Sequence, residues 1–198
     1  MSQFQICVSG AAKGPTVVDG KDLARSAGRA IASRNHHLLT GATTGIPNYA
    51  AQGAKSEKGM SIGLSPAHNL YTHVHDYRLP TECYDIIFYT GQEFIGRDVL
   101  LIQSSDAVIS IGGRIGTAHE FAVAMELGKP VAVLHGAGGT SEMFDEILRV
   151  AGEAGYPPII HGDDPDKLVE DVVALLEEKQ DEMSAIRRAH LELERQVP

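Results

Sequence analysis

A glycine-rich turn with a carboxylate shortly after it is the part of the sequence whose residue types point most directly to chemistry. The turn covers residues 112–117, follows the β-branched run 108–111 and precedes Glu120. Apolar residues then recur at helical spacing, so the chain passes here from a strand through a turn into a helix. Glycines let backbone N–H groups come close to a ligand, and a helix that begins near Gly116 or Thr117 directs its free N–H groups to the same place. The pattern predicts a phosphate site.

Three charged side chains near this turn are candidates for binding or catalysis. Glu120 could orient a water molecule or stabilise positive charge that develops on a ribosyl ring; alternatively, it only stabilises the dipole of its own helix. The planar guanidinium of Arg97 suits a phosphate or a carboxylate, Glu120 included, but it could also form a surface ion pair with Asp98 or Glu93. Arg114 lies within the turn, where it could clamp a phosphate or point to solvent.

Strand and helix signals alternate along the chain, which predicts an α/β fold with a doubly wound, mainly parallel sheet and helices on both faces. A second helix is expected to start near Pro47, and the charged tail from Lys179 is expected to form a further helix. About seven strands are predicted, at residues 4–8, 37–40, 60–64, 86–89, 107–111, 131–134 and 158–161.

Three glycine turns, at residues 9–14, 41–45 and 112–117, each follow a predicted strand. Because ligands of open α/β sheets bind outside the carboxyl ends of the strands, the three turns are expected to meet at one crevice. Glycines in such turns also occur only to satisfy backbone angles. No complete GxGxxG or GxxxxGK[ST] pattern is present, which argues against NAD binding and P-loop ATP hydrolysis. The predicted ligand contacts are Gly10, Lys13, Gly41, Thr43, Thr44, Gly45, Gly112, Gly113, Arg114, Gly116 and Thr117.

One segment of the chain resembles the LOG-type (lonely-guy) Rossmann proteins, formerly described as lysine decarboxylase-like. The matching residues, at the family's spacing from the arginine to the Ser-Asp-Ala triplet, are Arg97-Asp98, Ser105-Asp106-Ala107, Gly112-Gly113, Gly116-Thr117 and Glu120. Ile111 stands where the family has proline. Arg114-Ile115 places two residues before Gly116-Thr117, where the best-characterised members have one. This variant turn is more similar to the wider set of nucleotide-binding relatives that includes the molybdenum-cofactor carriers.

The resemblance implies a Rossmann-like fold and the binding of a phosphorylated nucleoside. It further implies hydrolysis of the N-glycosidic bond of a nucleoside 5′-monophosphate, with Arg97 and Glu120 as catalytic residues and no cofactor. The alternative is a non-catalytic nucleotide sensor or a carrier of a phosphorylated pterin such as molybdenum cofactor. The resemblance also implies a homodimer or a higher homo-oligomer, for which Phe121, Met125 and Leu127 are the expected contact surface.

Length and composition favour one domain. Together with the resemblance, this predicts a Rossmann-like nucleotide-binding domain at residues 1–180 with a C-terminal helical tail at 181–198. The 198 residues are 43% hydrophobic with a net charge of −9, which disfavours nucleic acid as a partner because its affinity for proteins comes mostly from Lys and Arg. No apolar run reaches the ~18 residues that a membrane span needs, so a cytoplasmic protein without a membrane partner is predicted. Cys7 and Cys83 lack CxxC spacing and are predicted to be ordinary buried thiols.

The histidine-rich segment 65–83 is the only extended irregular connection that the sequence predicts. Connections this long in compact domains are usually functional or disordered. His73, His75 and Asp76 could hold a metal, but nothing fixes the remaining ligands, so no metal site is predicted and the segment is interpreted as a lid over the crevice. His119, beside Glu120, faces the core or solvent, whereas His135 ends the sixth strand at the ligand edge, and either could touch a ligand.

Overall fold

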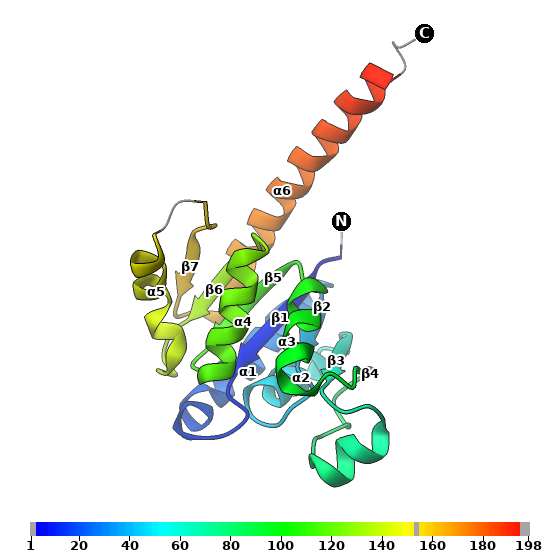
Figure 1. The fold of residues 1–198 in the computed structure, drawn as a ribbon, viewed down its shortest axis with the longest axis vertical. Helices are drawn as coiled ribbons and strands as arrows, with labels where there is room; N and C mark the ends of the chain where they lie inside the picture. Colours follow the sequence, from blue (N-terminus) through cyan, green and yellow to red (C-terminus); the bar gives the residue numbers. More distant parts are fainter. Residues whose placement is uncertain (1–2, 153–154, 195–198) are drawn as a thin grey trace.

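The computed structural model describes residues 3–152 and 155–194. It contains the predicted α/β fold, with an all-parallel sheet of seven strands between two layers of helices (Figure 1). The strands are β1 (Gln5–Gly10), β2 (His37–Thr40), β3 (Ser61–Ser65), β4 (Ile86–Tyr89), β5 (Ala107–Ile111), β6 (Val131–Leu134) and β7 (Ile159–Gly162). The α-helices are α1 (Pro15–Ser33), α2 (Ile46–Ser56), α3 (Glu93–Gln103), α4 (Ile115–Glu126), α5 (Phe144–Ala151) and α6 (Pro165–Glu194). Two short helices, η1 (Thr72–Asp76) and η2 (Thr140–Met143), complete the described elements.

The strand order β4-β3-β2-β1-β5-β6-β7 places the first strand in the middle of the sheet. The chain winds outward from β1 through β2 to β4 and then returns to the other side of β1 with β5, where Val8 pairs with Ile109. The order therefore reverses between β1 and β5. A doubly wound sheet binds its ligand at such a point, beyond the carboxyl ends of the two strands.

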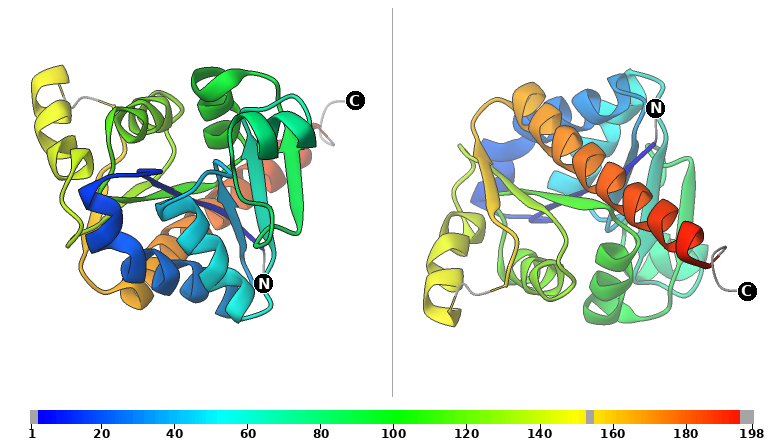
Figure 2. Two further views of the ribbon diagram at one scale, coloured as in Figure 1. Left: turned by 90° about the horizontal axis from the view of Figure 1, so that it is seen from below. Right: turned by 90° about the horizontal axis from the view of Figure 1, so that it is seen from above.

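Alternation along the strands explains why helices cover both faces of the sheet. Ile6 and Val8 point into a core formed with α1, α2 and α6, whereas Cys7, between them, points into a second core formed with α3, α4 and α5. Both views in Figure 2 show the two helical layers on opposite sides of the sheet. The central strand β5 is buried along its whole length, as its continuous run of small and β-branched residues requires.

The predicted dimer surface on α4 is wrong for two of its three residues. Phe121 is 1% exposed and Met125 is 4% exposed, because both lie on the side of α4 that covers the sheet. The ring of Phe121 stacks on that of Phe144 in α5, with 3.8 Å between the ring centroids. Only Leu127, at 43%, is exposed. The apolar spacing thus marked the core side of α4.

The C-terminal region forms one helix, α6, from Pro165 to Glu194. The further helix expected from Lys179 is therefore a continuation of the helix that begins at Pro165. Figure 1 shows its second half extending beyond the sheet. The proposed tail 181–198 begins within this helix, and its residues 195–198 lie outside the described part. Within residues 3–152 and 155–194, no helix combines the length and the apolar character of a membrane span.

Residues 66–82, which we call the arm, make up most of the connection between β3 and β4 and contain η1, so the connection is partly helical rather than wholly irregular. His73 is fully buried in the arm. Its Nδ1 lies 2.8 Å from the hydroxyl of Ser65, and its Nε2 lies 3.0 Å from the carbonyl oxygen of Pro80. Both ring nitrogens are thereby used within the protein. His73 ties the two ends of the arm together and is not placed to ligate a metal.

Candidate functional site

A crevice of about 380 Å³ opens at the carboxyl ends of β1 and β5, where the strand order reverses. It brings together parts of the three glycine turns with the first turns of α3 and α4. Its lining residues are Gly10, Ala11, Ala12, Thr43, Phe94, Ile95, Arg97, Asp98, Arg114, Ile115, Gly116, Thr117 and Glu120. None of the described residues of the arm contributes to this lining.

The predicted site residues fall into two groups. The crevice is lined by Gly10, Thr43, Arg97, Arg114, Gly116, Thr117 and Glu120. The remaining predicted contacts, Lys13, Gly41, Thr44, Gly45, Gly112 and Gly113, lie outside its lining. Several of these outer residues have structural roles, and Thr44 donates its hydroxyl hydrogen to the carbonyl oxygen of Ala12 at 3.0 Å.

The glycines outside the lining are required by the packing of the turns. A Cβ at position 41 would overlap the guanidinium of Arg97, so Gly41 makes room for the charge that reaches the crevice. Gly113 has a φ of +103°, and a Cβ there would press against the side chain of Thr117. Gly45 likewise combines a φ of +72° with close contact to backbone atoms of the first turn. These residues shape the site without facing it.

Gly116 is different, because a Cβ at this position would meet no atom within 4 Å. It lies in the first turn of α4, whose first N–H groups have no acceptor within the helix. The preceding Arg114 is extended and donates its backbone N–H to the hydroxyl of Thr117 at 3.4 Å. The start of α4 therefore presents free N–H groups and open space to the crevice, which is the arrangement that binds anions.

Glu120 and Arg97 form the buried floor of the crevice. Glu120 is 7% exposed, with its Oε1 3.4 Å from Nη1 of Arg97 and its Oε2 accepting a hydrogen bond from the hydroxyl of Ser9. Arg97 is 5% exposed and pairs with Asp98, one of the two partners considered for it, but this ion pair is buried rather than at the surface. Its Nε has no hydrogen-bond partner among the described residues. One donor of this guanidinium thus remains for further interactions.

The environment of Glu120 raises the pKa of its carboxyl group toward neutral pH. Burial raises the pKa of the Glu120 carboxyl to about 7, the positive charge of Arg97 opposes this, and the nearby carboxylate of Asp98 adds to it. Burial disfavours the ionised form because the carboxylate loses its hydration. A carboxyl group with such a pKa can both accept and release a proton near neutral pH.

Asp98 and His119 extend the buried floor toward the surface, and the sequence did not assign either of them this role. Nη2 of Arg97 lies 3.3 Å from Oδ1 of Asp98, and Oδ2 of Asp98 lies 3.0 Å from Nδ1 of His119. Asp98 is 4% exposed, whereas the His119 side chain is 33% exposed. His119 therefore lies half-buried at the surface, where it joins α4 to α3. The adjacency of Asp98 to Arg97 was the only signal in the sequence.

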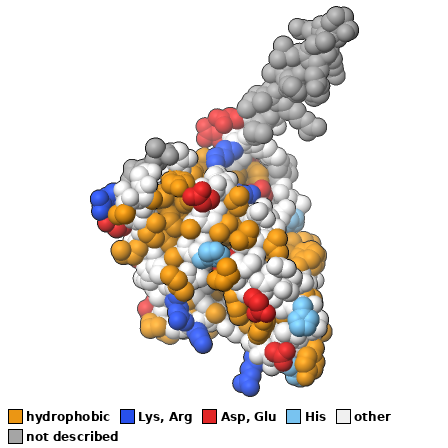
Figure 3. All heavy atoms as spheres, viewed as in Figure 1, with side chains coloured by type: hydrophobic (Ala, Val, Ile, Leu, Met, Phe, Trp, Pro, Cys, Tyr) orange, Lys and Arg blue, Asp and Glu red, His pale blue; other side chains and the backbone are white. Residues whose placement is uncertain are grey.

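Apolar side chains form the outer wall of the crevice. Phe94, Ile95 and Ile115 line it and are 45%, 65% and 83% exposed. Figure 3 shows hydrophobic side chains spread over the face of the molecule that carries α3, α4 and α5. Large apolar side chains at the mouth of a polar site provide a surface against which a planar ring can pack. The signal for two of them was the adjacent bulky apolar pair Phe94-Ile95, shortly before Arg97 in the sequence.

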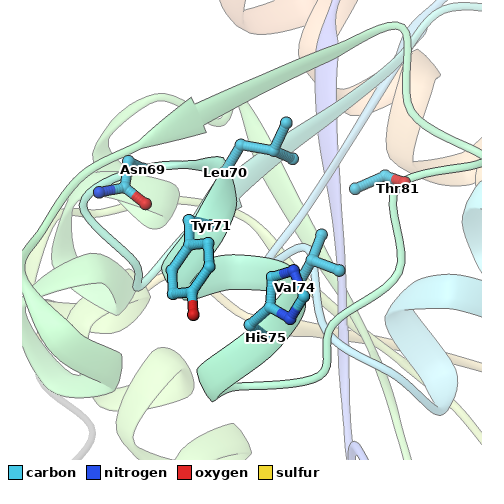
Figure 4. A pocket seen from close by; sticks show the side chains of 6 residues that line it. All are labelled: Asn69, Leu70, Tyr71, Val74, His75 and Thr81. Carbon is cyan, nitrogen blue, oxygen red and sulfur yellow. The ribbon is translucent and has the colours of Figure 1, made fainter.

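A second cavity, of about 660 Å³, lies along the arm (Figure 4). It is lined by Asn69, Leu70, Tyr71, Val74, His75 and Thr81. The ring of His75 stacks on that of Tyr71, with 4.5 Å between the centroids. The cavity contains none of the charged residues that meet in the crevice. Within residues 3–152 and 155–194, no group of three or more His, Cys, Asp or Glu side chains is arranged to hold a metal ion.

Known proteins resemble this chain both in sequence and in structure. The sequence model of the SLOG cluster4 family matches residues 3–168. An uncharacterised protein of Archaeoglobus fulgidus is 35% identical over 135 residues, which are 68% of this chain and 82% of the relative. The structure of the molybdenum cofactor binding protein from the phototrophic bacterium Rippkaea orientalis is 27% identical, with a TM-score of 0.71 over 89% of this chain and 99% of that one. The Moco carrier protein from Chlamydomonas reinhardtii is 26% identical, with a TM-score of 0.72 over 90% and 99%.

Proposed function

The chain belongs to the SLOG cluster4 family, and from this premise we propose that its crevice binds a phosphorylated nucleoside or a similarly phosphorylated heterocycle. The observation that carries the proposal is the start of α4, where the open side of Gly116 lies in a crevice that also contains Arg97 and Glu120. Free N–H groups and the positive end of a helix favour a phosphate. Packing does not require glycine at position 116, because a Cβ there would meet no atom within 4 Å.

In this proposal, each part of the ligand has its own place along the lining of the crevice. The phosphate lies against the backbone of residues 115–117, within reach of Arg114. The planar base packs against Phe94 and Ile95 at the mouth of the crevice. The sugar then lies above Glu120, between the phosphate and the base.

With the sugar in this position, we propose that the protein hydrolyses the N-glycosidic bond of nucleoside 5′-monophosphates. Glu120 accepts a proton from a water molecule, whose oxygen forms a bond to C1′ of the ribose. The bond between C1′ and the base nitrogen breaks, and the base leaves with the electron pair and takes up a proton from solvent, while Glu120 returns its proton to solvent. Arg97 holds the Glu120 carboxylate in place and adds positive charge near the phosphate. The products are the free base and ribose 5-phosphate.

Incubation with a panel of nucleoside monophosphates, followed by chromatography of the reaction mixture, tests this activity. We expect release of free base, a loss of ~10² or more in rate for Glu120→Ala, and nearly unchanged affinity for the ligand. Arg97→Ala should lose both rate and affinity, because a cation near the phosphate also stabilises the bound ground state. Glu126→Ala, at the other end of α4, serves as the control. Equal rates for Glu120→Ala and the wild type would contradict the assignment.

A carrier of a phosphorylated pterin, such as molybdenum cofactor, is the second candidate. It is favoured by the similarity to proteins named as carriers or binders of that cofactor. The two residues Arg114-Ile115 within the turn also support it, since a small displacement of Glu120 from the ribose is enough to prevent catalysis. Monophosphates that bind without being cleaved by the intact protein would favour this candidate over the hydrolase.

We also propose that the protein acts as a homodimer or higher homo-oligomer in the cytoplasm and does not bind nucleic acid. The net charge of −9 supports the last point. The division into a domain at 1–180 and a tail at 181–198 is a further proposal. Its support is that α6 extends past the sheet beyond its contacts with β6 and β7.

A further inference from the structure

Two histidines and two carboxylates form a chain of contacts at the carboxyl edge of β6 and β7, outside the lining of the crevice. Val133 of β6 pairs with His161 of β7, so His135, two residues beyond Val133, lies on the same face of the sheet. Nε2 of His135 and Nδ1 of His161 are 3.1 Å apart. Glu142 of η2 and Asp145 of α5 cover this face, one beside each ring.

Each histidine uses its other ring nitrogen to contact a carboxylate. Nδ1 of His135 lies 2.8 Å from Oε2 of Glu142, and Nε2 of His161 lies 3.2 Å from Oδ1 of Asp145. Within the protein, a hydrogen bond accounts for the short contact between Nε2 of His135 and Nδ1 of His161, since one of these nitrogens can donate to the other. When both imidazole N–H groups instead point to their carboxylates, the two facing nitrogens both offer lone pairs. A cation can then bind between them in place of the shared proton.

The spacing of the two nitrogens suits a transition-metal ion. With metal–nitrogen bonds of about 2.0–2.1 Å and a tetrahedral angle, two histidine ligands are about 3.3 Å apart, close to the 3.1 Å found here. Histidines that ligate metals commonly donate their other N–H to a carboxylate, which fixes the ring and makes the ligating nitrogen more basic. Both rings have such a carboxylate, and their side chains are 37% and 36% exposed.

We propose that His135 and His161 bind one divalent transition-metal ion of the imidazole-preferring class, such as Zn²⁺ or Co²⁺. Glu142 orients the ring of His135 and Asp145 orients the ring of His161, each through the ring nitrogen that does not bind the metal. Water completes the coordination on the exposed side. A site with two protein ligands is compatible with the absence of any group of three ligating side chains among residues 3–152 and 155–194. The hard cations Mg²⁺ and Ca²⁺ are excluded, because they prefer oxygen ligands.

The site is connected to the turn that precedes α4. The loop between β6 and η2 carries Gly138 and Gly139, and the segment after it donates backbone N–H groups from Ser141 to Gly112 at 3.0 Å and from Thr140 to Gly113 at 3.3 Å. A metal held by His135, with Glu142 behind it, therefore braces the segment that supports the glycine turn of the crevice. The site does not depend on the function proposed for that crevice.

Titration of the untagged, chelator-treated full chain with Co²⁺ and Zn²⁺ tests the proposal, using the visible absorption of Co²⁺ and calorimetry as readouts. We expect one ion per chain, no heat from Mg²⁺ at the same concentrations, and a rise in the thermal midpoint on adding Zn²⁺. His135→Gln and His161→Gln should each abolish the one-to-one binding. Glu142→Gln and Asp145→Asn should weaken it by about 10–100-fold, the range known for carboxylates behind metal-ligating histidines.

The exposed His75, on the arm, provides the matched control: His75→Gln should bind Co²⁺ as the wild type does. Circular dichroism of each variant verifies that it is folded, so that loss of binding reports on the site. Failure of the wild type to bind one equivalent, or binding that survives in the double variant His135→Gln/His161→Gln, would overturn the proposal. Retention of nucleotide binding in that double variant would show that the metal site and the crevice are separate.

Discussion

Glu120 has a carboxyl group that ionises less readily in the folded protein than in the unfolded chain, because burial raises its pKa from 4.5 to about 7. The folded state thus binds this proton more tightly. The contribution of the protonated group to stability is fully present below the unfolded pKa and is lost as the pH rises through the folded one. Asp98, Arg97 and Ser9 face the same carboxyl group, and Asp98 strengthens the shift.

The variant Glu120→Gln, which cannot ionise, should therefore gain stability relative to the wild type at high pH. Denaturant unfolding at about pH 5 and about pH 8 measures the difference between the two proteins. We expect the difference to move in favour of the variant by on the order of 1 kcal/mol or more between the two conditions. The same measurement on Asp98→Asn reports whether the proton is shared with that residue. A difference independent of pH would contradict the raised pKa.

Gly116 permits a test of ligand binding that leaves the fold intact. Alanine fits there without a clash and is the better helix former, so Gly116→Ala should keep the stability of the protein or raise it by up to about 1 kcal/mol. The added methyl group enters the space assigned to the phosphate, and nucleotide affinity measured by calorimetry should fall. Unchanged affinity would place the phosphate elsewhere. Gly113→Val is less informative, because a side chain there collides with Thr117 even without a ligand.

The conformation of the arm depends on one buried polar side chain, that of His73. Replacement of His73 by alanine leaves Ser65 and the carbonyl group of Pro80 without their partner, at a cost of about 1–3 kcal/mol. Hydrogen exchange should become faster in residues 66–82 and stay unchanged in the central strands. The exposed His75, replaced in the same way, should change stability by less than about 0.5 kcal/mol. Equal effects of the two substitutions would show that the buried hydrogen bonds do not hold the arm.

For the whole molecule, we predict a homodimer or higher oligomer formed through a face other than the buried side of α4. On the face covered by α3 and α4, large apolar side chains remain exposed, among them Phe88 at 55%, Ile95 at 65% and Leu100 at 38%. Sedimentation at micromolar concentration should show a species heavier than the 21.2 kDa chain. Phe88→Glu and Leu100→Glu should shift it toward the monomer, whereas Val18→Glu, on the opposite layer, should not. A wild type that sediments as a monomer would refute the prediction.

Local sequence patterns determined the order and type of the helices and strands, because secondary structure depends on residues that are close together in the chain. The seven segments predicted as strands each became a strand within two residues of the predicted bounds, and the alternation with helices implied the parallel sheet. The glycine turn before α4, with Glu120 after it, was recognisable for the same reason. The start of α4 at Ile115, rather than at Gly116, differs only by a helix end.

The tertiary structure alone decided which side chains meet. His119 contacts Asp98 across 21 residues of sequence, and His135 contacts His161 across 26. Apolar spacing showed that α4 has one hydrophobic side but not whether the sheet or a partner chain covers it, and Phe121 proved to face the sheet. Contacts of this kind depend on the packing of elements that are distant in the chain, which periodicity does not encode. The sequence therefore determined the sheet and its glycine turns, and packing decided the polar contacts around them.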